Sequence, residues 1–419
     1  MKKLLQINPV VRISTSTGRI MQEIGELAMQ NGWESYIAYG FGRDGHKPCA
    51  SQLIPVGNTW DVRWHGVMTR LFDRHGLASK RATRQFVEQI KQIDPDIIHI
   101  HNIHGYFLNY PILFDYLSTC GKPVIWTVHD CWLYTGHCYY YSYEGCNRWE
   151  SHCNLCPQQR KFPASYVLDR SAANFDDKQK SFTSLSKSLF RIVPVSNWIR
   201  GEMSRSFLKD YDFQVIHNGI DTSIFQPRSI EAVKQKYGLT DKRHILLGVA
   251  SIWSDEKGLS DFLSLAEHIN EEEIIVLVGV DESLKNRLPK QIKAISRTEN
   301  IEQLAELYSA ATAFVNPTWQ DNYPTVNMEA ISCGTPVVTY RTGGSIETIT
   351  PDTGRIVEQG EIEGLLHAVR EIEELGKDFF TPRCRDYALA HFRKEERYAD
   401  YLQLYEQLCH KSNNKISNK

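Results

Sequence analysis

Residues 314–344, FVNPTWQDNYPTVNMEAISCGTPVVTYRTGG, decide the fold of the C-terminal half of the chain. The stretch begins with a short β-rich run closed by Pro317, passes through Asn-Tyr-Pro, and continues as an apolar run that stops at Gly334. Proline is accepted in the first turn of a helix and glycine often ends one. The spacing therefore predicts a strand, a helix from Pro324 to about Cys333, a second strand and a glycine turn.

Two carboxylates eight positions apart lie in this stretch, Asp321 in the loop before the helix and Glu329 inside it. The backbone N–H groups at the helix start, near Tyr323, Pro324 and Thr325, favour a phosphate. A carboxylate accepts strong hydrogen bonds from sugar or ribose hydroxyls. This order predicts a sugar-nucleotide pocket. The alternative is that Asp321 only caps the helix and Glu329 is solvated.

The stretch resembles the signature of the family 4 retaining glycosyltransferases, in which two acids eight positions apart precede a run like Ala330–Val338. The resemblance implies the GT-B fold: α/β, with two doubly wound Rossmann-like domains facing each other across a cleft. It also implies that Asp321 faces the donor sugar and acts in catalysis, and that Glu329 binds the nucleotide ribose. Gly343-Gly344 with Glu347 matches a further element of the family. The family has glutamate where this chain has Asp321, which leaves the donor sugar open.

Three residues outside the stretch match the family by position. Lys257 follows the run 244–252 and implies a contact with the donor diphosphate, whereas the arginine usual about five residues earlier is absent. Arg12, Arg19 and Arg341 are candidates to replace that arginine. Gly18, between a first strand and a first helix, resembles the glycine loop that approaches the donor. His129, at the end of the predicted strand 123–130, resembles the histidine near the reacting sugar. Without the family context, Lys257 would be an ordinary surface lysine and His129 a structural histidine.

The length of 419 residues suits two α/β domains. We expect an N-terminal acceptor-side domain at 1–188 and a C-terminal nucleotide-sugar-binding domain at 189–392. A helix at 393–410, with Tyr398, Leu402, Tyr405 and Leu408 at helical spacing, is expected to cross back to the first domain. Residues 411–419 are polar and are expected to form a flexible tail.

The net charge of −2 gives no basic footprint for nucleic acid, and no apolar run reaches the roughly 18 residues of a membrane span. The N-terminus reads as a first strand and not as a signal peptide, so we expect a cytoplasmic protein. Residues 63–84 mix arginine and lysine with apolar side chains, Trp64 among them, and Trp60 lies just before this segment. This segment predicts peripheral contact with the inner face of a membrane, or alternatively a solvated helix face.

Cysteines are concentrated between residues 131 and 156. Cys138, Cys146, Cys153 and Cys156 form C-x7-C-x6-C-x2-C, a pattern that suits a structural zinc in a cytosolic chain. His137 and His152 are alternative ligands, and four buried free thiols are the other interpretation. His-Asp-Cys-Trp at 129–132 with the trailing Cys-x-x-Cys-Pro resembles the colanic-acid-type subset of the family, found in capsule and exopolysaccharide assembly. That resemblance implies a lipid-linked saccharide acceptor.

The resemblance thus implies a metal-independent hexosyltransferase that retains the anomeric configuration of a nucleoside-diphosphate sugar and needs no catalytic cofactor. GxGxxG is absent, so NAD is not indicated. Two alternatives stay open. One is a sugar-nucleotide epimerase of the same fold, and the other is a degenerate, non-catalytic binding protein.

Overall fold

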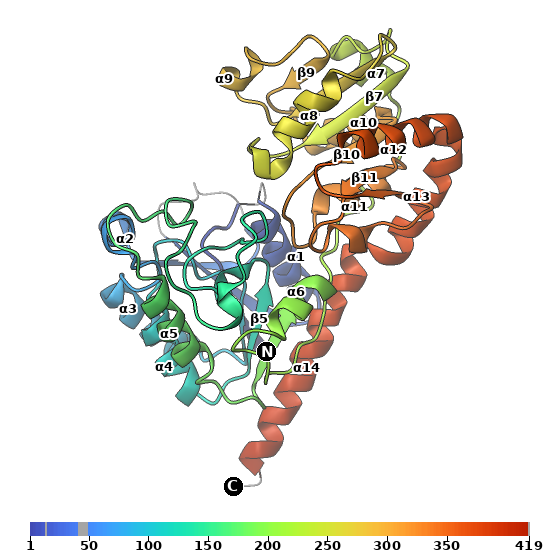
Figure 1. Cartoon of the computed structure of the whole chain (residues 1–419). Helices are drawn as coiled ribbons and strands as arrows, with labels where there is room; N and C mark the ends of the chain where they lie inside the picture. The colour runs from blue at the N-terminus through green and yellow to red at the C-terminus, as the bar shows by residue number, and fades with distance from the viewer. Residues whose placement is uncertain (13–14, 41–48, 418–419) are drawn as a thin grey trace. The chain divides into compact units, whose positions relative to one another are not determined.

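The computed structural model describes residues 1–12, 15–40 and 49–417, and these residues form two compact units. The first unit comprises Met1–His217 together with the chain from Arg397 onward, and the second comprises Asn218–Glu396. Each unit contains one six-stranded sheet with helices packed against it (Figure 1). The predicted α/β architecture with two Rossmann-like sheets is confirmed.

The first sheet is parallel and has the strand order β3-β2-β1-β4-β5-β6. This is the doubly wound order, in which the direction of winding reverses between the first and fourth strands. The strands are β1 (Lys2–Ile7), β2 (Trp33–Gly40), β3 (Gln52–Val56), β4 (Ile97–Ile100), β5 (Val124–Val128) and β6 (Phe190–Pro194). The helices of this unit are α1 (Ser16–Gln30), α2 (Thr59–Phe72), α3 (Lys80–Ile93), α4 (Tyr110–Thr119), α5 (Ser171–Phe182), α6 (Asn197–Met203) and most of α14 (Lys394–Ser417).

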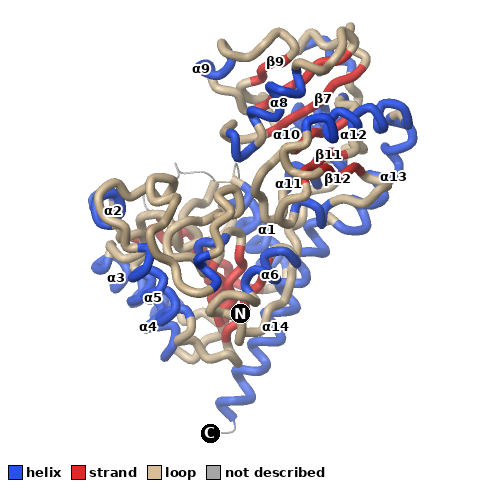
Figure 2. The backbone as a smooth tube through the Cα atoms, in the orientation of Figure 1, coloured by secondary structure: helices blue, strands red, loops and turns tan. Residues whose placement is uncertain are grey.

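Helices bury both faces of the first sheet. Adjacent residues of a strand point to opposite faces, so each face has its own cluster of packed side chains. Leu5 and its same-face neighbours pack in one cluster with Phe86 of α3, Phe114 of α4 and Phe182 of α5. Figure 2 shows α3, α4 and α5 side by side. Leu4 belongs to the opposite cluster, which contains apolar residues of α1 and the aromatic residues of α14. The C-terminal helix therefore completes the core of the first unit.

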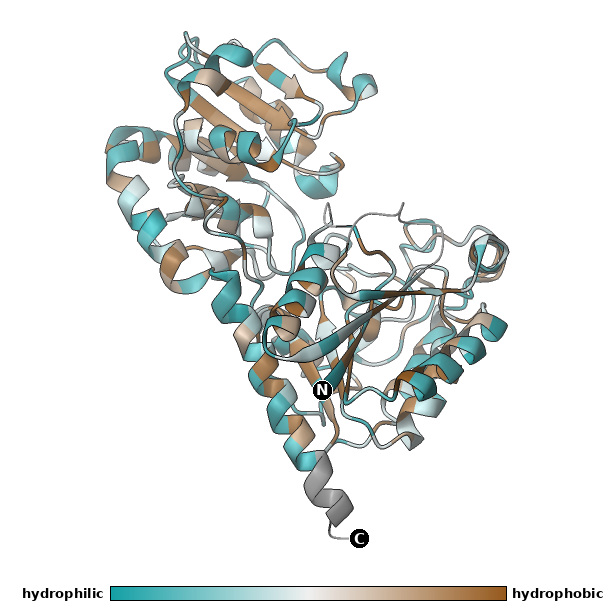
Figure 3. Cartoon of the chain, turned by 180° about the vertical axis from the view of Figure 1, so that it is seen from behind, coloured by the Kyte–Doolittle hydropathy of each residue, from teal (hydrophilic) through white to brown (hydrophobic). Residues whose placement is uncertain are grey.

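The second sheet repeats the same parallel order, β12-β11-β10-β7-β8-β9. Its strands are β7 (His244–Val249), β8 (Glu273–Val278), β9 (Ile292–Ile295), β10 (Ala313–Asn316), β11 (Val337–Tyr340) and β12 (Gly354–Val357). The helices are α7 (Glu231–Lys236), α8 (Leu259–Ala266), α9 (Glu282–Lys285), α10 (Ile301–Ala310), α11 (Thr325–Ser332), α12 (Ile362–Leu375) and α13 (Lys377–His391). The strands at the centre of this sheet are strongly hydrophobic (Figure 3), as expected for a parallel sheet covered by helices.

The domain boundary lies further along the chain than the predicted break between residues 188 and 189. β6 (Phe190–Pro194) pairs in parallel with β5 and is the last strand of the first sheet, so the chain leaves the first unit only after His217. A buried strand near a boundary has the same apolar pattern in either domain, and only its partner strand assigns it. The helix predicted at 393–410 is also longer, because α14 continues to Ser417 through part of the predicted tail.

Candidate functional site

Two loops meet at the carboxyl edge of the second sheet. β7 and β10 are neighbours in this sheet although two strands separate them in the sequence, so the loops that follow them lie together. The Trp319 backbone N–H donates to the Glu256 carbonyl at 3.0 Å, which joins the loop after β10 to the 3-10 turn Asp255–Lys257. This edge is where the strand order reverses, the position at which open α/β sheets bind ligands.

Lys257 and Asp321 form an ion pair at this edge, with 2.9 Å between Nζ and Oδ2. The lysine side chain is 38% exposed and the aspartate side chain 18%, so solvent reaches the pair. The Tyr323 backbone N–H donates to the other carboxylate oxygen of Asp321 at 3.3 Å. A cation and a carboxylate from separate loops are thus held together beside the start of α11, where both remain accessible to a ligand.

Two glycines let the backbone approach this pair closely. Gly258 has φ +77°, and a Cβ there would lie 2.4 Å from the Pro317 carbonyl oxygen. Gly343 has φ +47°, and a Cβ there would lie 1.9 Å from the carbonyl oxygen of Asp321. Both positions combine a left-handed backbone with contact to another chain segment, so only glycine fits. Gly343 belongs to the Gly-Gly turn noted in the sequence, whereas Gly258 drew attention only as the neighbour of Lys257.

A polar network that sequence reasoning missed supports the same loops. The Trp319 indole N–H and the Tyr340 hydroxyl donate to the two carboxylate oxygens of Asp261, at 2.9 and 2.6 Å. Burial and the hydrogen bond to Asp261 raise the pKa of Tyr340, so the phenol stays protonated as the donor. The Gln320 side chain donates to Glu256 at 2.8 Å. Asp261 and Glu256 therefore fix the loop that carries Asp321.

Glu329 is buried in α11, 5% exposed, and accepts a hydrogen bond from the Tyr308 hydroxyl of α10 at 3.2 Å. The alternative of a solvated Glu329 is therefore wrong. Asp321 does not cap α11 either, since the N-cap is Pro324, without a side-chain hydrogen bond, and Thr325 is the first helical residue. Buried Asn327 bonds to Asn316 of β10 at 2.8 Å and to Ser345 at 3.0 Å, which fixes α11 against the sheet.

Gly18 and His129 lie in the first unit. Gly18 is in the first turn of α1, where its backbone N–H donates to the N-cap side chain of Thr15 at 3.3 Å. A Cβ at Gly18 would lie 2.3 Å from the Arg12 carbonyl oxygen, so a larger residue would push the preceding loop away. Arg341, in the second unit, has its Nε bonded to Glu358 at 2.6 Å.

His129 takes part in a chain of hydrogen bonds that crosses the first sheet from strand to strand. Its Nε2 bonds to His101 Nδ1 at 3.1 Å, and His101 Nε2 bonds to Gln6 Oε1 at 3.0 Å. Burial lowers the pKa of His129 to about 4, against the opposing charge of Asp130, so its imidazole is neutral near pH 7. His129 lines a small cavity with His104 and Asp130, whose side chains bond at 2.7 Å. A neutral imidazole here can accept or donate a hydrogen bond to a sugar hydroxyl.

These buried histidines predict acid sensitivity of the first unit. Burial lowers the pKa of His75, His99 and His101 well below the usual value. The unfolded chain therefore binds more protons below about pH 6.5, and stability is lost as the pH falls through that value. Each such histidine should cost up to about 1.4 kcal/mol per pH unit. We expect the urea midpoint, followed by near-UV circular dichroism at constant ionic strength, to be clearly lower at pH 5.5 than at pH 7.5. Equal midpoints would contradict neutral buried imidazoles.

The four cysteines of the C-x7-C-x6-C-x2-C pattern line one cavity in the first unit, together with His137. All four are free thiols. Within residues 1–12, 15–40 and 49–417, no three His, Cys, Asp or Glu side chains are already arranged to hold a metal ion. His152, the other alternative ligand, bonds to Asp176 at 3.0 Å with its side chain 45% exposed, and it is not among the residues that line the cavity.

Comparisons with known proteins identify the family of the chain. The family described as Glycosyltransferase Family 4 matches residues 17–224, and the one described as Glycosyl transferases group 1 matches residues 243–374. A relative from Escherichia coli (strain K12), whose name assigns it to colanic acid biosynthesis as the glycosyl transferase WcaC, is 21% identical. The alignment covers 97% of this chain and 100% of the relative.

Two solved structures have the same arrangement of elements. Sucrose-phosphate synthase from Thermosynechococcus elongatus has a TM-score of 0.73 at 17% identity, with 97% of this chain and 99% of that chain covered. Anabaena Alr3699/HepE, solved in complex with UDP, has a TM-score of 0.67 at 14% identity, with 97% and 100% covered. At these identities the likeness establishes the fold, and the predicted GT-B fold is confirmed.

Proposed function

The chain belongs to the glycosyltransferases of these two family descriptions, and from that premise we propose that it transfers a sugar from a nucleoside diphosphate to a lipid-linked saccharide. We place this reaction in the assembly of a bacterial surface polysaccharide and assign it retention of the anomeric configuration. The observation that carries the proposal is the Lys257–Asp321 pair at the point where the second sheet reverses its strand order. The name of the E. coli relative supports the process, and the UDP and UDP-glucose complexes of Anabaena HepE support the donor class.

The donor would be held by the second unit. Lys257 would contact the diphosphate, Asp321 the sugar and Glu329 the ribose, while the backbone N–H groups at the start of α11, after Pro324, would bind the phosphates. The Lys257 ammonium then stabilises the negative charge that develops on the departing diphosphate. This stabilisation is electrostatic and preorganised, because Lys257 is already held by Asp321 at 2.9 Å.

Retention in this proposal follows a front-face path, in which the leaving phosphate oxygen helps to take the proton of the acceptor hydroxyl. We assign no protein nucleophile and no catalytic base. His129, neutral near pH 7, would hydrogen-bond the reacting sugar and not remove a proton from the acceptor. No catalytic metal or other cofactor is needed along this path, since cationic side chains and helix N-termini supply the positive charge.

The ribose role of Glu329 can be measured as nucleotide affinity. A hydrogen bond to a charged group contributes about 1.5–3 kcal/mol, so Glu329→Ala should weaken nucleotide binding by roughly 10- to 150-fold. Isothermal titration calorimetry with the preferred nucleoside diphosphate measures this change, and circular dichroism confirms the fold of the variant. Glu363→Ala on the exposed side of α12 is the matched control and should bind as the parent does. Parental affinity in a folded Glu329→Ala protein would remove the assignment.

A surface of the first unit supports a membrane-bound acceptor. Along α2, the side chains of Trp60, Trp64, Val67, Leu71 and Phe72 are 75, 60, 42, 40 and 39% exposed. The segment 166–168 lies beside the end of α2, since the Tyr166 and Leu168 backbone N–H groups donate to the carbonyls of Arg70 and Leu71. Tyr166, Val167 and Leu168 are themselves 60, 63 and 46% exposed. We call these eight apolar residues the α2 patch.

Exposed arginines accompany the α2 patch, namely Arg63, Arg70 and Arg74. Interfacial tryptophans with arginines on the same helix suit the headgroup layer of an anionic bilayer. Among the helices in the described part of the chain, none has the length and apolar character needed to cross a bilayer. We therefore propose peripheral contact with the inner face of the membrane through the α2 patch.

Vesicle binding tests this contact. Each arginine near an anionic surface contributes about 1 kcal/mol, so Arg63→Gln with Arg70→Gln should weaken binding to phosphatidylserine vesicles by roughly 30-fold. Trp60→Ala with Trp64→Ala should weaken it as well, through loss of buried apolar area. Leu389→Ala, at an exposed leucine of α13, is the control and should bind normally. Co-sedimentation that is unchanged in both double variants would rule out the α2 patch as the membrane surface.

The activity itself is tested with a panel of labelled nucleotide sugars in the presence and absence of a bacterial membrane extract. Release of nucleoside diphosphate that depends on the extract, with label in the lipid fraction, is the expected result. Isomerisation of the nucleotide sugar without the extract would instead identify an epimerase. Absence of nucleotide binding would identify a non-catalytic relative.

A further inference from the structure

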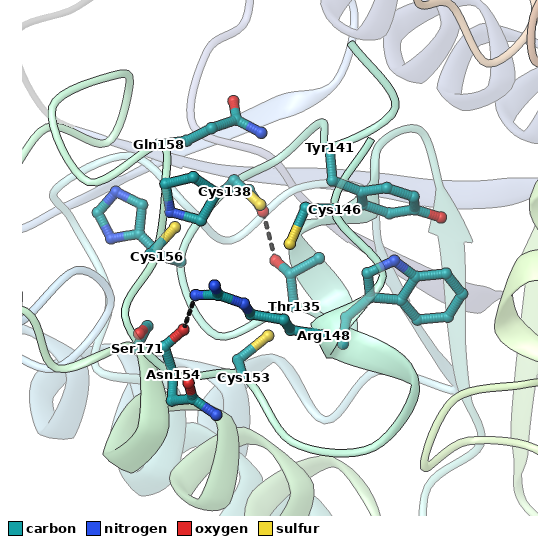
Figure 4. A pocket seen from close by; sticks show the side chains of 13 residues that line it. Thr135, Cys138, Tyr141, Cys146, Arg148, Cys153, Asn154, Cys156, Gln158 and Ser171 are labelled. Atoms are coloured by element: carbon teal, nitrogen blue, oxygen red, sulfur yellow. Dashed lines mark hydrogen bonds between the residues drawn. The ribbon is translucent and has the colours of Figure 1, made fainter. Parts of the chain in front are cut away.

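We propose that Cys138, Cys146, Cys153 and Cys156 bind one structural zinc ion, which ties together the long loop between β5 and α5. Figure 4 shows that the four cysteines line one cavity, and that the side chains of Thr135 and Arg148 also project into it. The volume of the cavity is about 20 Å³, which is enough for one ion or one water molecule at its centre. A tetrahedral set of thiolates is the ligand set that zinc prefers in structural sites, and Cys153-x2-Cys156 supplies the short spacing of a zinc hairpin.

The loop has little regular structure, so a cross-link would add to the order that its buried aromatic side chains already give. Residues 129–170 contain only two short 3-10 turns, Cys131–Leu133 and Arg148–Glu150, and the loop is far longer than the roughly 15 residues usual for a segment without its own helices or strands. Because such a loop buries little regular structure, its order has to come from side-chain contacts or from a bound ion. The four cysteines that line one cavity could hold such an ion.

His137 gives a second, independent sign of a bound ligand. It lines the same cavity and is 2% exposed, and its Nε2 has no hydrogen-bond partner. Its Nδ1 bonds to the fully buried Asp73 carboxylate at 2.7 Å, which fixes the ring. A buried ring nitrogen without a hydrogen-bond partner is costly, and an ion bound with its thiolates beside the ring would remove that cost. We assign His137 as a residue that positions the thiolates, not as a ligand.

A buried amine lies beside the cavity, where its charged form would offset the negative charge of zinc-bound thiolates. Lys178 is 1% exposed, and its Nζ donates to the carbonyls of Trp132 and Thr135 at 2.6 and 2.8 Å, just before Cys138 in the chain. It lies close enough to Cys138 and Cys153 for their charges to interact. The thiols still have to turn toward the centre, since no three groups in the described ranges stand at metal-binding geometry. We propose that rotation about Cα–Cβ, between staggered rotamers, makes this change when the ion binds.

The position of the loop links this site to α2. Asp73, the C-cap of α2, accepts from the Arg170 backbone N–H at 2.9 Å as well as holding His137. The Cys156 backbone N–H donates to Asp169 at 2.7 Å, and residues 166–168 follow the end of α2. A zinc ion at the cysteines would therefore stabilise the surface formed by α2 and residues 166–168, whatever that surface binds.

Metal analysis of the full-length protein, purified under reducing conditions, tests the proposal directly. We expect about one equivalent of zinc. Cobalt substitution should give the thiolate-to-metal charge-transfer bands of a tetrahedral sulfur site. Zinc below a tenth of an equivalent after reconstitution, without cobalt bands, would overturn it, and so would two disulfides in the same four cysteines by mass spectrometry of the protein as isolated from cells.

Thiol protection keeps the test independent of whether variants fold. In the zinc-loaded parent protein, the four cysteines should resist alkylation until a strong chelator is added, whereas Cys120, outside the loop, should react equally before and after. Equal reactivity of the four with and without chelator would contradict the site. Cys153→Ser with Cys156→Ser should lose zinc and Cys120→Ser should retain it, and His137→Gln should retain the stoichiometry with about 10- to 100-fold weaker affinity. Loss of all zinc in a folded His137→Gln protein would overturn the four-cysteine ligand set.

Discussion

Replacing Lys257 with alanine should lower kcat/KM for sugar transfer by roughly 10²- to 10³-fold, the usual effect of removing one preorganised group that stabilises developing charge. Lys257 Nζ lies 2.9 Å from Asp321 Oδ2 at the carboxyl edge of the second sheet, where we place the donor diphosphate. Departure of the nucleoside diphosphate concentrates negative charge at that point. Truncation leaves Asp321 partly exposed, with its hydrogen bond from the Tyr323 backbone N–H intact, so it should cost the fold little.

The measurement is initial-rate release of nucleoside diphosphate with the preferred donor and a saturating amount of acceptor. Lys285→Ala is the matched control, because Lys285 is a lysine of the same unit whose ion pair, with Glu282 at 3.3 Å, stays within its own short helix. Lys257→Arg keeps the charge and should recover much of the rate. If Lys257→Ala and Lys285→Ala have similar kcat/KM values, Lys257 has no role in stabilising the leaving group.

The family resemblance predicted that Lys257 and Asp321 serve one donor site, and each of them follows a strand. Parallel strands expose their carboxyl ends at one edge, so polar residues after two of them share that edge. What the local pattern could not supply is that β7 and β10 are neighbours. That adjacency came from the family resemblance, which fixes the strand order, and the observed order β9-β8-β7-β10-β11-β12 agrees with it.

The errors and omissions of the sequence analysis have one physical cause, namely contacts between residues that are distant in the sequence. Asp261 lies in the first turn of α8, where an acidic residue is already favourable for the helix dipole and needs no further explanation. Its hydrogen bonds with Trp319 and Tyr340 join residues 58 and 79 positions apart, so no local sequence pattern predicts them. The misplaced domain boundary has the same origin, because β6 is assigned by its partner β5 and not by its own composition.

In the first unit, the sequence predicts where site residues lie along the chain and its strands, but not which side chains they contact. His129 was placed correctly after a buried strand, yet its bond to His101 depends on the distance between neighbouring strands. The four cysteines were recognised as a group by their spacing. The role of His137 beside them became visible only through Asp73, which approaches from α2, far away in the sequence.

Gly343→Ala should reduce kcat/KM by about 10²-fold while leaving the protein folded, because the glycine positions Asp321 without touching substrate itself. An alanine Cβ would lie 1.9 Å from the Asp321 carbonyl oxygen, and φ +47° is already unfavourable for a side chain. The Gly344 backbone N–H donates to the same carbonyl at 3.2 Å. An added Cβ at Gly343 would therefore either displace the turn together with the Asp321 loop or break this hydrogen bond. A displacement of about 1 Å at a positioned group commonly costs that factor in rate.

The control for Gly343 has to separate backbone strain from displacement of Asp321. Gly238 has a similar backbone, with φ +60°, but a Cβ there would meet nothing within 4 Å. Gly238→Ala should therefore lose about 1 kcal/mol of stability with unchanged kcat/KM, whereas Gly343→Ala should lose activity beyond its loss of stability. Thermal melts and initial rates on both variants make the comparison. Equal activity in the two would mean that the turn at Gly343 tolerates the added methyl group and that Asp321 is held by its other contacts, above all by Lys257.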